Sequence, residues 1–121
     1  KKYFDKGDPY HCYCHKTTRL ISEKFSSIKI KTTFQSRFGP QEWLQPYTDK
    51  TLENLPKEGV KNVLTICPGF ASDCVETLEE IQIQAKESFL NSGGENFDMV
   101  PCLNDNSDHI TLLKSLIERN I

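Results

Sequence analysis

The fold is decided by residues 60–102, which read VKNVLTICPGFASDCVETLEEIQIQAKESFLNSGGENFDMVPC. The apolar runs 60–67 and 97–102 have the length and composition of short β-strands. The segment between them is long enough for a helix that crosses from one strand to the other. A strand, a crossover helix and a second strand form the repeating unit of a parallel sheet.

The crossover helix carries its own start and stop signals. Asp73 and Glu76 have the spacing of a capping box, with an aspartate at the N-cap and a glutamate three residues later. The helix is expected to continue to about Leu90. Gly93-Gly94 then stops it, because glycine commonly follows the last turn of a helix.

The same alternation extends along the rest of the chain. A helix is predicted over 10–25, a strand over 28–34, a loop with Trp43 over 35–46 and a short helix over 50–55, with Thr48 as its N-cap. Ser107 opens a last helix, with Ile110, Leu113 and Ile117 on one face. The order α-β-α-β-α-β-α predicts one α/β domain over 1–121: a three-layer sandwich of Rossmann-like type, with a parallel sheet covered by helices on both faces. Ligands of such sheets bind beyond the carboxyl ends of the strands.

Composition excludes several classes of protein. A chain of 121 residues has room for one ordinary domain. Its 15 basic and 17 acidic residues give a net charge of −2, which argues against a nucleic-acid partner. No apolar run approaches the length of a membrane span. Five cysteines, an odd number without a signal peptide, favour the reducing cytoplasm.

The crossover helix also carries a row of polar side chains. Glu76, Glu80 and Gln84 are four residues apart and therefore share one helix face. Carboxylates in such a row can bind a hard or borderline cation, or accept protons. A solvated acidic face, with Glu76 serving only the helix cap, is the alternative interpretation.

The cysteines give a weaker signal. Cys12 and Cys14 lie between His11 and His15, but alternate residues of a helix point in nearly opposite directions, and a structural zinc site needs a second ligand pair. Incidental thiols are therefore favoured there. Cys67 and Cys74 are interpreted as a free pair rather than a disulfide.

A third candidate lies in the proline-containing loop 35–46. Arg37 and Trp43 could hold a flat anionic ligand, with the indole as a stacking plane. A tryptophan packed within the loop is the alternative. The chain has no dinucleotide-binding, Walker or nucleophile-elbow motif.

Several stretches, taken in order, resemble the C-terminal half of ferrochelatase. They are Gly7-Asp8-Pro9-Tyr10, TFQSRFG at 33–39, EWLQPYTD at 42–49, CPGFASDCVETLEE at 67–80 and VPCLN at 100–104. The resemblance covers essentially the whole chain. It implies an enzyme that inserts ferrous iron into protoporphyrin IX to give protoheme, the last step of heme biosynthesis. It also implies two Rossmann-like domains that face each other across a porphyrin cleft.

The resemblance implies roles for individual residues. Glu76 matches the catalytic glutamate, which binds metal or receives pyrrole protons, and Glu80 continues the acidic row on an unusual, wide-turn helix. Cys74 stands near the site, where some relatives have a histidine, and Gln84 where some have a glutamate. The residues matched to porphyrin contacts are Gln35, Ser36, Arg37, Trp43, Phe70 and Asp73.

The resemblance also defines what this chain lacks. The N-terminal domain and the catalytic histidine segment are absent, and His11, His15 and His109 do not match that histidine, so the chain alone is expected to be inactive. No cofactor is expected beyond the substrate Fe²⁺. A [2Fe–2S] cluster would need Cys12 and Cys14 together with cysteines upstream, and four ligands cannot be placed on this chain.

Three questions stay open at this point. The enzyme is expected in the cytoplasm, and contact with the periphery of the inner membrane is a further option. The porphyrin could be coproporphyrin III instead of protoporphyrin IX. Alternative functions are a non-catalytic, flavodoxin-like module that holds a metal or tetrapyrrole, and a cobalt or nickel chelatase of similar fold.

Overall fold

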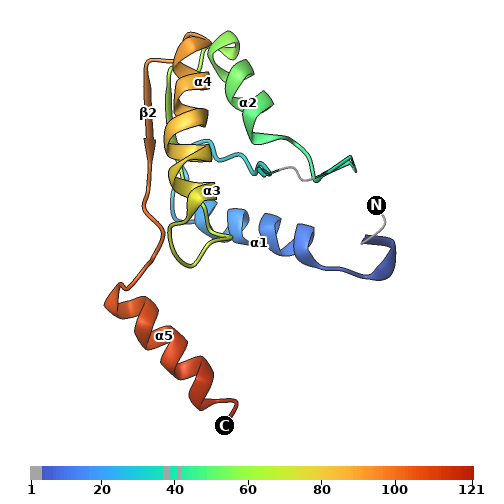
Figure 1. Cartoon of the computed structure of the whole chain (residues 1–121), viewed down its shortest axis with the longest axis vertical. Coiled ribbons are helices and arrows are strands. Elements are labelled where there is room, and N and C mark those ends of the chain that lie inside the picture. Colours follow the sequence, from blue (N-terminus) through green and yellow to red (C-terminus); the bar gives the residue numbers. More distant parts are fainter. Residues whose placement is uncertain (1–3, 37–38, 41) are drawn as a thin grey trace. The chain divides into compact units, whose positions relative to one another are not determined.

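The computed structural model describes residues 4–36, 39–40 and 42–121. The chain divides into two compact units, Lys1–Leu52 and Glu53–Ile121. Figure 1 traces the chain through its elements. In the first unit these are the 3₁₀ turn η1 (Phe4–Lys6), α1 (Tyr10–Ser22) and most of α2 (Thr48–Asn54). In the second unit they are η2 (Leu55–Glu58), β1 (Asn62–Thr65), α3 (Val75–Leu78), η3 (Glu80–Ala85), α4 (Lys86–Asn91), β2 (Asn96–Met99) and α5 (Ser107–Glu118).

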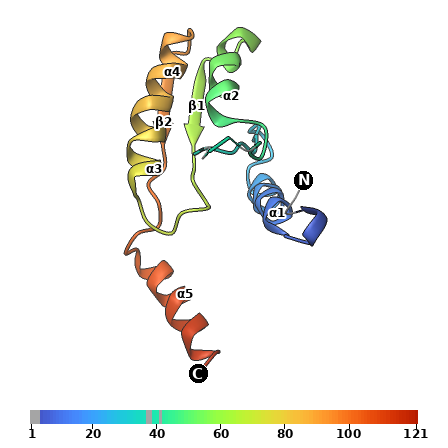
Figure 2. The same cartoon turned by 45° about the vertical axis from the view of Figure 1, so that its right-hand side comes forward.

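The centre of the second unit is a parallel pair of strands. β1 and β2 pair in register, with Asn62 opposite Asn96 and Thr65 opposite Met99. The run α3–η3–α4 connects them, and its η3 and α4 segments pack on β2 (Figure 2). This is the strand–helix–strand unit that residues 60–102 predict, and the α/β class is confirmed.

The core of this unit lies between the crossover helix and β2. Phe89 is fully buried and meets the ring of Phe97 at a centroid separation of 5.9 Å. Ile81 and Ala85 are buried on the same side of the helix. Burying such apolar side chains gives about 1.5–3 kcal/mol for each large one, which fixes the helix against the strand.

The crossover helix ends in a Schellman motif. The N–H of Gly94 donates to the carbonyl of Phe89, and the N–H of Gly93 donates to the carbonyl of Leu90, both at 3.0 Å. Gly93 has a φ of +100°, a conformation that favours glycine. Gly94 has a different constraint, since a Cβ at this position would overlap the ring of Phe89. The predicted stop at Gly93-Gly94 is confirmed.

The strand predicted over 28–34 is wrong for the residues that the structure describes. Only Phe34 takes part in a bridge, a single parallel one with Tyr47. The N–H of Phe34 donates to the carbonyl of Pro46 at 2.9 Å, and its carbonyl accepts from Thr48 at 3.0 Å. The alternating pattern thus marks one buried aromatic residue rather than a strand, because in the part of the chain that the structure describes the β-pairing of this segment is limited to the bridge at Phe34.

The last helix is confirmed, and it begins at Ser107 as expected. Asn106 is its N-cap, and its side chain accepts a hydrogen bond from the N–H of Asp108. The apolar residues Ile110, Leu113 and Ile117 are all exposed, at 50%, 41% and 62%. Among the described helices, none is long and apolar enough to cross a membrane.

Candidate functional site

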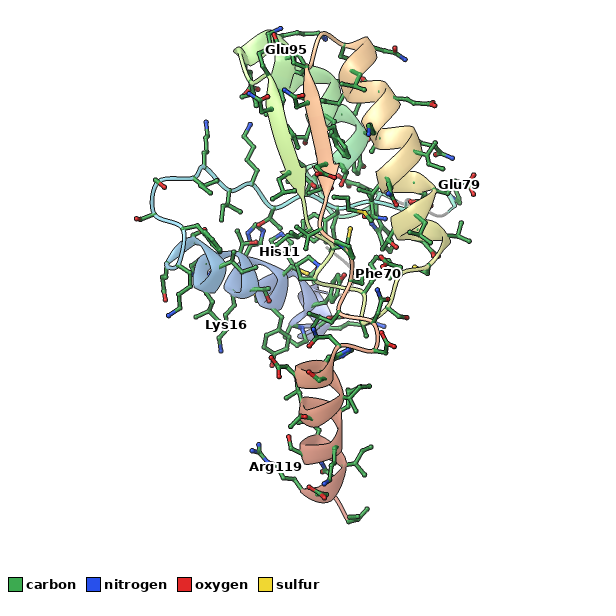
Figure 3. All side chains as sticks on the ribbon, turned by 90° about the vertical axis from the view of Figure 1, so that its left-hand side faces the viewer. His11, Lys16, Phe70, Glu79, Glu95 and Arg119 are labelled. Atoms are coloured by element: carbon green, nitrogen blue, oxygen red, sulfur yellow. The ribbon has the colours of Figure 1, made fainter. Side chains whose placement is uncertain are left out.

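The candidate site lies where β1 and β2 end and the crossover helix begins. Asp73, Cys74 and Glu76 surround the first turn of α3, and Phe70 lies in the preceding tight turn, where its N–H donates to the carbonyl of Cys67 (Figure 3). Glu80 follows one turn later at the start of η3. The structure therefore brings these candidates together at one end of the sheet, as the rule for parallel sheets predicts.

The helix cap differs from the prediction by one residue. Cys74, not Asp73, is the N-cap, and Thr77 takes the place expected for Glu76. The fully buried hydroxyl of Thr77 accepts a hydrogen bond from the Cys74 N–H and donates one to Asp73 Oδ1, each at 3.0 Å. The reason for the shift is that Asp73 is already held by other partners. Glu76 is consequently not used by the capping box, although it lies in the first turn.

Asp73 joins two loops of the second unit. Its Oδ2 accepts from Asn104 Nδ2 at 2.8 Å, and its own N–H donates to Asn104 Oδ1 at 2.8 Å. Its Oδ1 also accepts from the N–H of Cys102 at 3.3 Å. These bonds, first the one from the Asn104 side chain, hold the pKa of Asp73 below its usual range. The carboxylate thus fixes the loop after β1 to the loop after β2.

Asn104 joins the candidate site through its contacts with Asp73, although the sequence motifs do not single it out. It has a φ of +46°, its N–H donates to the carbonyl of Ala71 at 3.0 Å, and its carbonyl lies 2.8 Å from Nδ1 of the buried His109. Asparagine tolerates this left-handed conformation better than most residues. Its position within the VPCLN stretch is the only signal that could have found it.

Glu76 is the site carboxylate with the clearest electrostatic setting. A hydrogen bond with the Cys74 side chain, and a second one with its own backbone N–H, keep the pKa of Glu76 below its usual range. The partial positive charge of a helix N-terminus also favours an anion at this place. Glu76 is half-buried and ionised at neutral pH, so it can attract a cation or take part in proton transfer.

The helix that carries Glu76 contains a π-helical turn, η3, which confirms the wide turn that the resemblance implies. The N–H of Gln84 donates to the carbonyl of Glu79 at 2.9 Å, five residues back, and the Gln84 side chain donates to Glu79 Oε1 at 3.2 Å. Residues five apart do not face each other on an α-helix. π-turns are rare and are frequent at functional sites.

The π-turn keeps a four-residue repeat on one face. Thr77, Ile81, Ala85 and Phe89 are all buried. In an uninterrupted α-helix, residues 77 and 89 would be rotated by about 120° relative to each other. The π-turn contains one residue more than an α-helical turn and so corrects this rotation. The same four-residue spacing relates Glu76, Glu80 and Gln84 on the neighbouring face. The polar row therefore stays beside the buried row along the helix.

Three thiols lie close to Asp73. Burial, followed by the hydrogen bond and the charge of Asp73, raises the pKa of Cys102 to about 11. Burial, then the charges of Asp73 and Cys74, also raises the pKa of Cys67. None of the five cysteines, all of which the structure describes, forms a disulfide, which agrees with the interpretation of Cys67 and Cys74. Among the described residues, no group of three or more His, Cys, Asp or Glu side chains could hold a metal ion.

The remaining candidates lie in the first unit, apart from Arg37, which falls outside the described residues. The Gln35 side chain donates to Ser36 Oγ at 3.4 Å, and Ser36 has a φ of +58°. Trp43 is 39% exposed, so part of its side chain is accessible to solvent. These residues remain predictions for porphyrin contact.

Comparison with known proteins completes the description of the site. A sequence model of the family described as Ferrochelatase matches residues 1–121. The chain is 56% identical over 123 residues to a ferrochelatase of Rhizobium meliloti, covering 100% of this chain and 36% of that protein. It is 56% identical over 122 residues to one of Marinobacter nauticus, with coverage of 99% and 33%. Identity to one of Pseudoalteromonas atlantica is 54% over 123 residues, with coverage of 100% and 34%. The chain thus spans about a third of the length of the curated relatives it matches.

Proposed function

Because the chain belongs to the ferrochelatase family, we propose that it forms part of an enzyme that inserts ferrous iron into protoporphyrin IX. Porphyrin and iron are its substrates, and protoheme is the product. The observation that carries this proposal is the position of Glu76 on a helix interrupted by a π-turn, within a chain that the family model covers from residue 1 to 121.

We propose that Glu76 acts as the site carboxylate. Metal insertion requires two pyrrole N–H protons to leave as the cation arrives. An anionic oxygen near the ring can bind the cation and pass protons to solvent. The lowered pKa of Glu76 favours the charged form, which suits attraction of Fe²⁺ better than long-term storage of a proton. Glu80 lies one turn further along and would extend the path.

We propose that Asp73 positions this carboxylate. Its oxygens already accept hydrogen bonds from Thr77, Cys102 and Asn104, and they hold the first turn of α3 against the loop after β2. Phe70, at the turn before α3, then supplies an apolar surface for the macrocycle. Gln35, Ser36, Arg37 and Trp43 are proposed as further porphyrin contacts, with the rest of the cleft in the part of the relatives that this chain does not cover.

The test measures metal insertion by the complete polypeptide that contains this chain. Anaerobic Fe²⁺ and protoporphyrin IX are supplied, and the wild type is compared with Glu76→Gln. The amide keeps the size of the side chain but removes its charge. Activity is expected to fall at least about 100-fold, which corresponds to roughly 2.7 kcal/mol of barrier. Glu87→Gln, an exposed glutamate in the first turn of α4, is the matched control and is expected to keep its activity.

The outcomes separate the competing readings. If Glu76→Gln were as active as Glu87→Gln, the protein would still be an enzyme, but a residue other than Glu76 would be its catalytic carboxylate. Activity with coproporphyrin III, Co²⁺ or Ni²⁺ but not with protoporphyrin IX and Fe²⁺ would change the substrate. No insertion by a folded polypeptide under any of these conditions would favour a non-catalytic binding module. Five cysteines without a disulfide agree with a reducing compartment, which supports the proposal of a cytoplasmic enzyme.

A further inference from the structure

Two histidines of the first unit converge on one point. His11 and His15 lie one turn apart on α1, and their Nε2 atoms are 3.2 Å from each other. Their ring centroids are 4.5 Å apart. Both side chains are half-buried, and His11 is labelled on α1 in Figure 3. The thiols between them, Cys12 and Cys14, drew attention in the sequence, but it is the flanking imidazoles that meet.

Phe34 holds this pair in place. Its buried ring stacks on His11 at a centroid distance of 5.6 Å and an interplanar angle of 20°, and it meets the edge of His15 at 6.2 Å and 64°. Aromatic contacts of this kind restrict the rotation of both imidazoles. Part of the entropy that a flexible pair would lose on binding a ligand is therefore already lost in the folded chain.

We propose that His11 and His15 form a two-histidine chelate for a divalent transition-metal ion of the Zn²⁺, Co²⁺ and Ni²⁺ class. Imidazole is a preferred ligand of these ions, with metal–nitrogen distances of about 2.0–2.1 Å. Two nitrogens at that distance lie roughly 3.0 Å apart in octahedral geometry and roughly 3.4 Å apart in tetrahedral geometry. The observed separation of 3.2 Å falls between these values.

The hydrogen bond between the two imidazoles is compatible with this chelate. At 3.2 Å the two Nε2 atoms cannot both carry a hydrogen, so at least one of them presents a lone pair. Without a metal, one imidazole donates a hydrogen bond to the other. When a metal ion binds, the hydrogen between the two Nε2 atoms passes through solvent to Nδ1 of the ring that carried it, so that both Nε2 atoms present lone pairs to the metal.

The site binds an exchangeable ion rather than a structural one. Structural zinc sites have four protein ligands. Within the described ranges, no third His, Cys, Asp or Glu completes a group with these two. Water therefore fills the remaining positions, and the ion can leave through them.

The test is a titration of the purified, untagged protein with Co²⁺, followed by its visible absorption and by calorimetry. The wild type is expected to bind one ion at the histidine pair, and His15→Gln and His11→Gln are each expected to bind that ion at least about tenfold more weakly. Glutamine can keep a hydrogen bond to the remaining histidine, and circular dichroism verifies that each variant is folded.

The matched control is the double variant Cys12→Ser/Cys14→Ser, which keeps both histidines and is expected to bind Co²⁺ as the wild type does. Loss of binding in this control would assign the metal to the thiols and overturn the proposal. Equal binding by the wild type and His15→Gln would overturn it as well. So would the absence of binding by the folded wild type at millimolar Co²⁺. None of these outcomes depends on porphyrin metallation, so the test is independent of the proposed enzyme activity.

Discussion

Replacing Gly94 by alanine tests how the crossover helix is packed. A Cβ at this position would overlap the ring of Phe89, which is fully buried. Neighbouring Gly93 has a different constraint, because its φ is +100° while the nearest atoms to an added Cβ are at ordinary contact distance, 3.8 Å or more. The two adjacent glycines therefore resist substitution for different physical reasons.

The magnitudes predict the sign of the effect. Gly94 does not have a positive φ. In the absence of the overlap, Gly94→Ala would therefore stabilise the folded state by about 0.4–1 kcal/mol, because alanine lowers the conformational entropy of the unfolded chain. Overpacking against a rigid neighbour costs about 1–3 kcal/mol. The overlap outweighs the gain, and Gly94→Ala is expected to lower the free energy of unfolding by about 1–2 kcal/mol. Gly93→Ala is expected to lower it by about 1–2 kcal/mol through its backbone conformation.

A second substitution separates the two causes. Phe89→Leu removes the ring that Gly94→Ala would meet. In that background the cost of Gly94→Ala is expected to fall by about 1 kcal/mol or more, a coupling typical of residues in contact. The cost of Gly93→Ala is expected to stay within about 0.5 kcal/mol of its original value, because its added Cβ faces Pro56 and Lys61 instead.

The assay is urea unfolding of the purified protein, followed by circular dichroism and analysed at equal m-values. All single and double variants are measured under the same conditions. A neutral or stabilising Gly94→Ala would refute the reasoning. An equal cost of Gly94→Ala in both backgrounds would also contradict it, since the overlap with the ring would then not be the cause.

Other predictions concern the Asp73 network. Asn104→Gly tolerates the φ of +46° but loses both side-chain hydrogen bonds to Asp73. Asn104→Ala loses the same bonds and adds backbone strain, so in urea unfolding it is expected to be about 1–2 kcal/mol less stable than the glycine variant. Equal urea midpoints of the two variants would contradict this. The depressed pKa of Asp73 contributes stability that is present above about pH 4, the unfolded pKa, and is lost as the pH falls through the folded value. In Asn104→Gly the decrease in unfolding free energy at acid pH is expected to be smaller. An unchanged pH profile would show that Asn104 is not the main cause of the depressed pKa of Asp73. Cys102, with a pKa of about 11, is expected to react with iodoacetamide at pH 8 at least about tenfold more slowly than exposed Cys12, as followed by mass spectrometry, and similar rates would disprove its protection.

Much of the second unit could be predicted from the sequence because its signals are local. The strands and the helix of residues 60–102 follow from composition and length, and the stop at Gly93-Gly94 follows from a backbone requirement that few other residues meet. The clustering of Phe70, Asp73 and Glu76 follows from the rule that strand ends of a parallel sheet meet at one edge.

The predictions that proved wrong concern residues whose local structure depends on a partner far along the chain. The cap of α3 begins at Cys74 rather than at Asp73, because Asn104, far along the chain, holds the Asp73 carboxylate. Residues 28–34 have the alternation of a strand, but a strand requires a ladder of β-bridges, and among the described residues this segment forms its bridge at Phe34. The convergence of His11 and His15 has a signal in the sequence, because residues four apart lie on the same face of a helix.

The π-turn means that the crossover helix can be understood as an ordinary α-helix into which one residue has been inserted. Removing one exposed residue of η3, such as Gln82, would leave the buried positions 77, 81, 85 and 89 separated by four, three and four residues. That is the normal periodicity of an α-helix facing a sheet. The core therefore has no need of the extra residue, and the insertion changes only what the polar face presents. Shortening η3 by one residue would therefore change the polar face that carries the candidate site, while the buried face that packs on the sheet would keep its pattern.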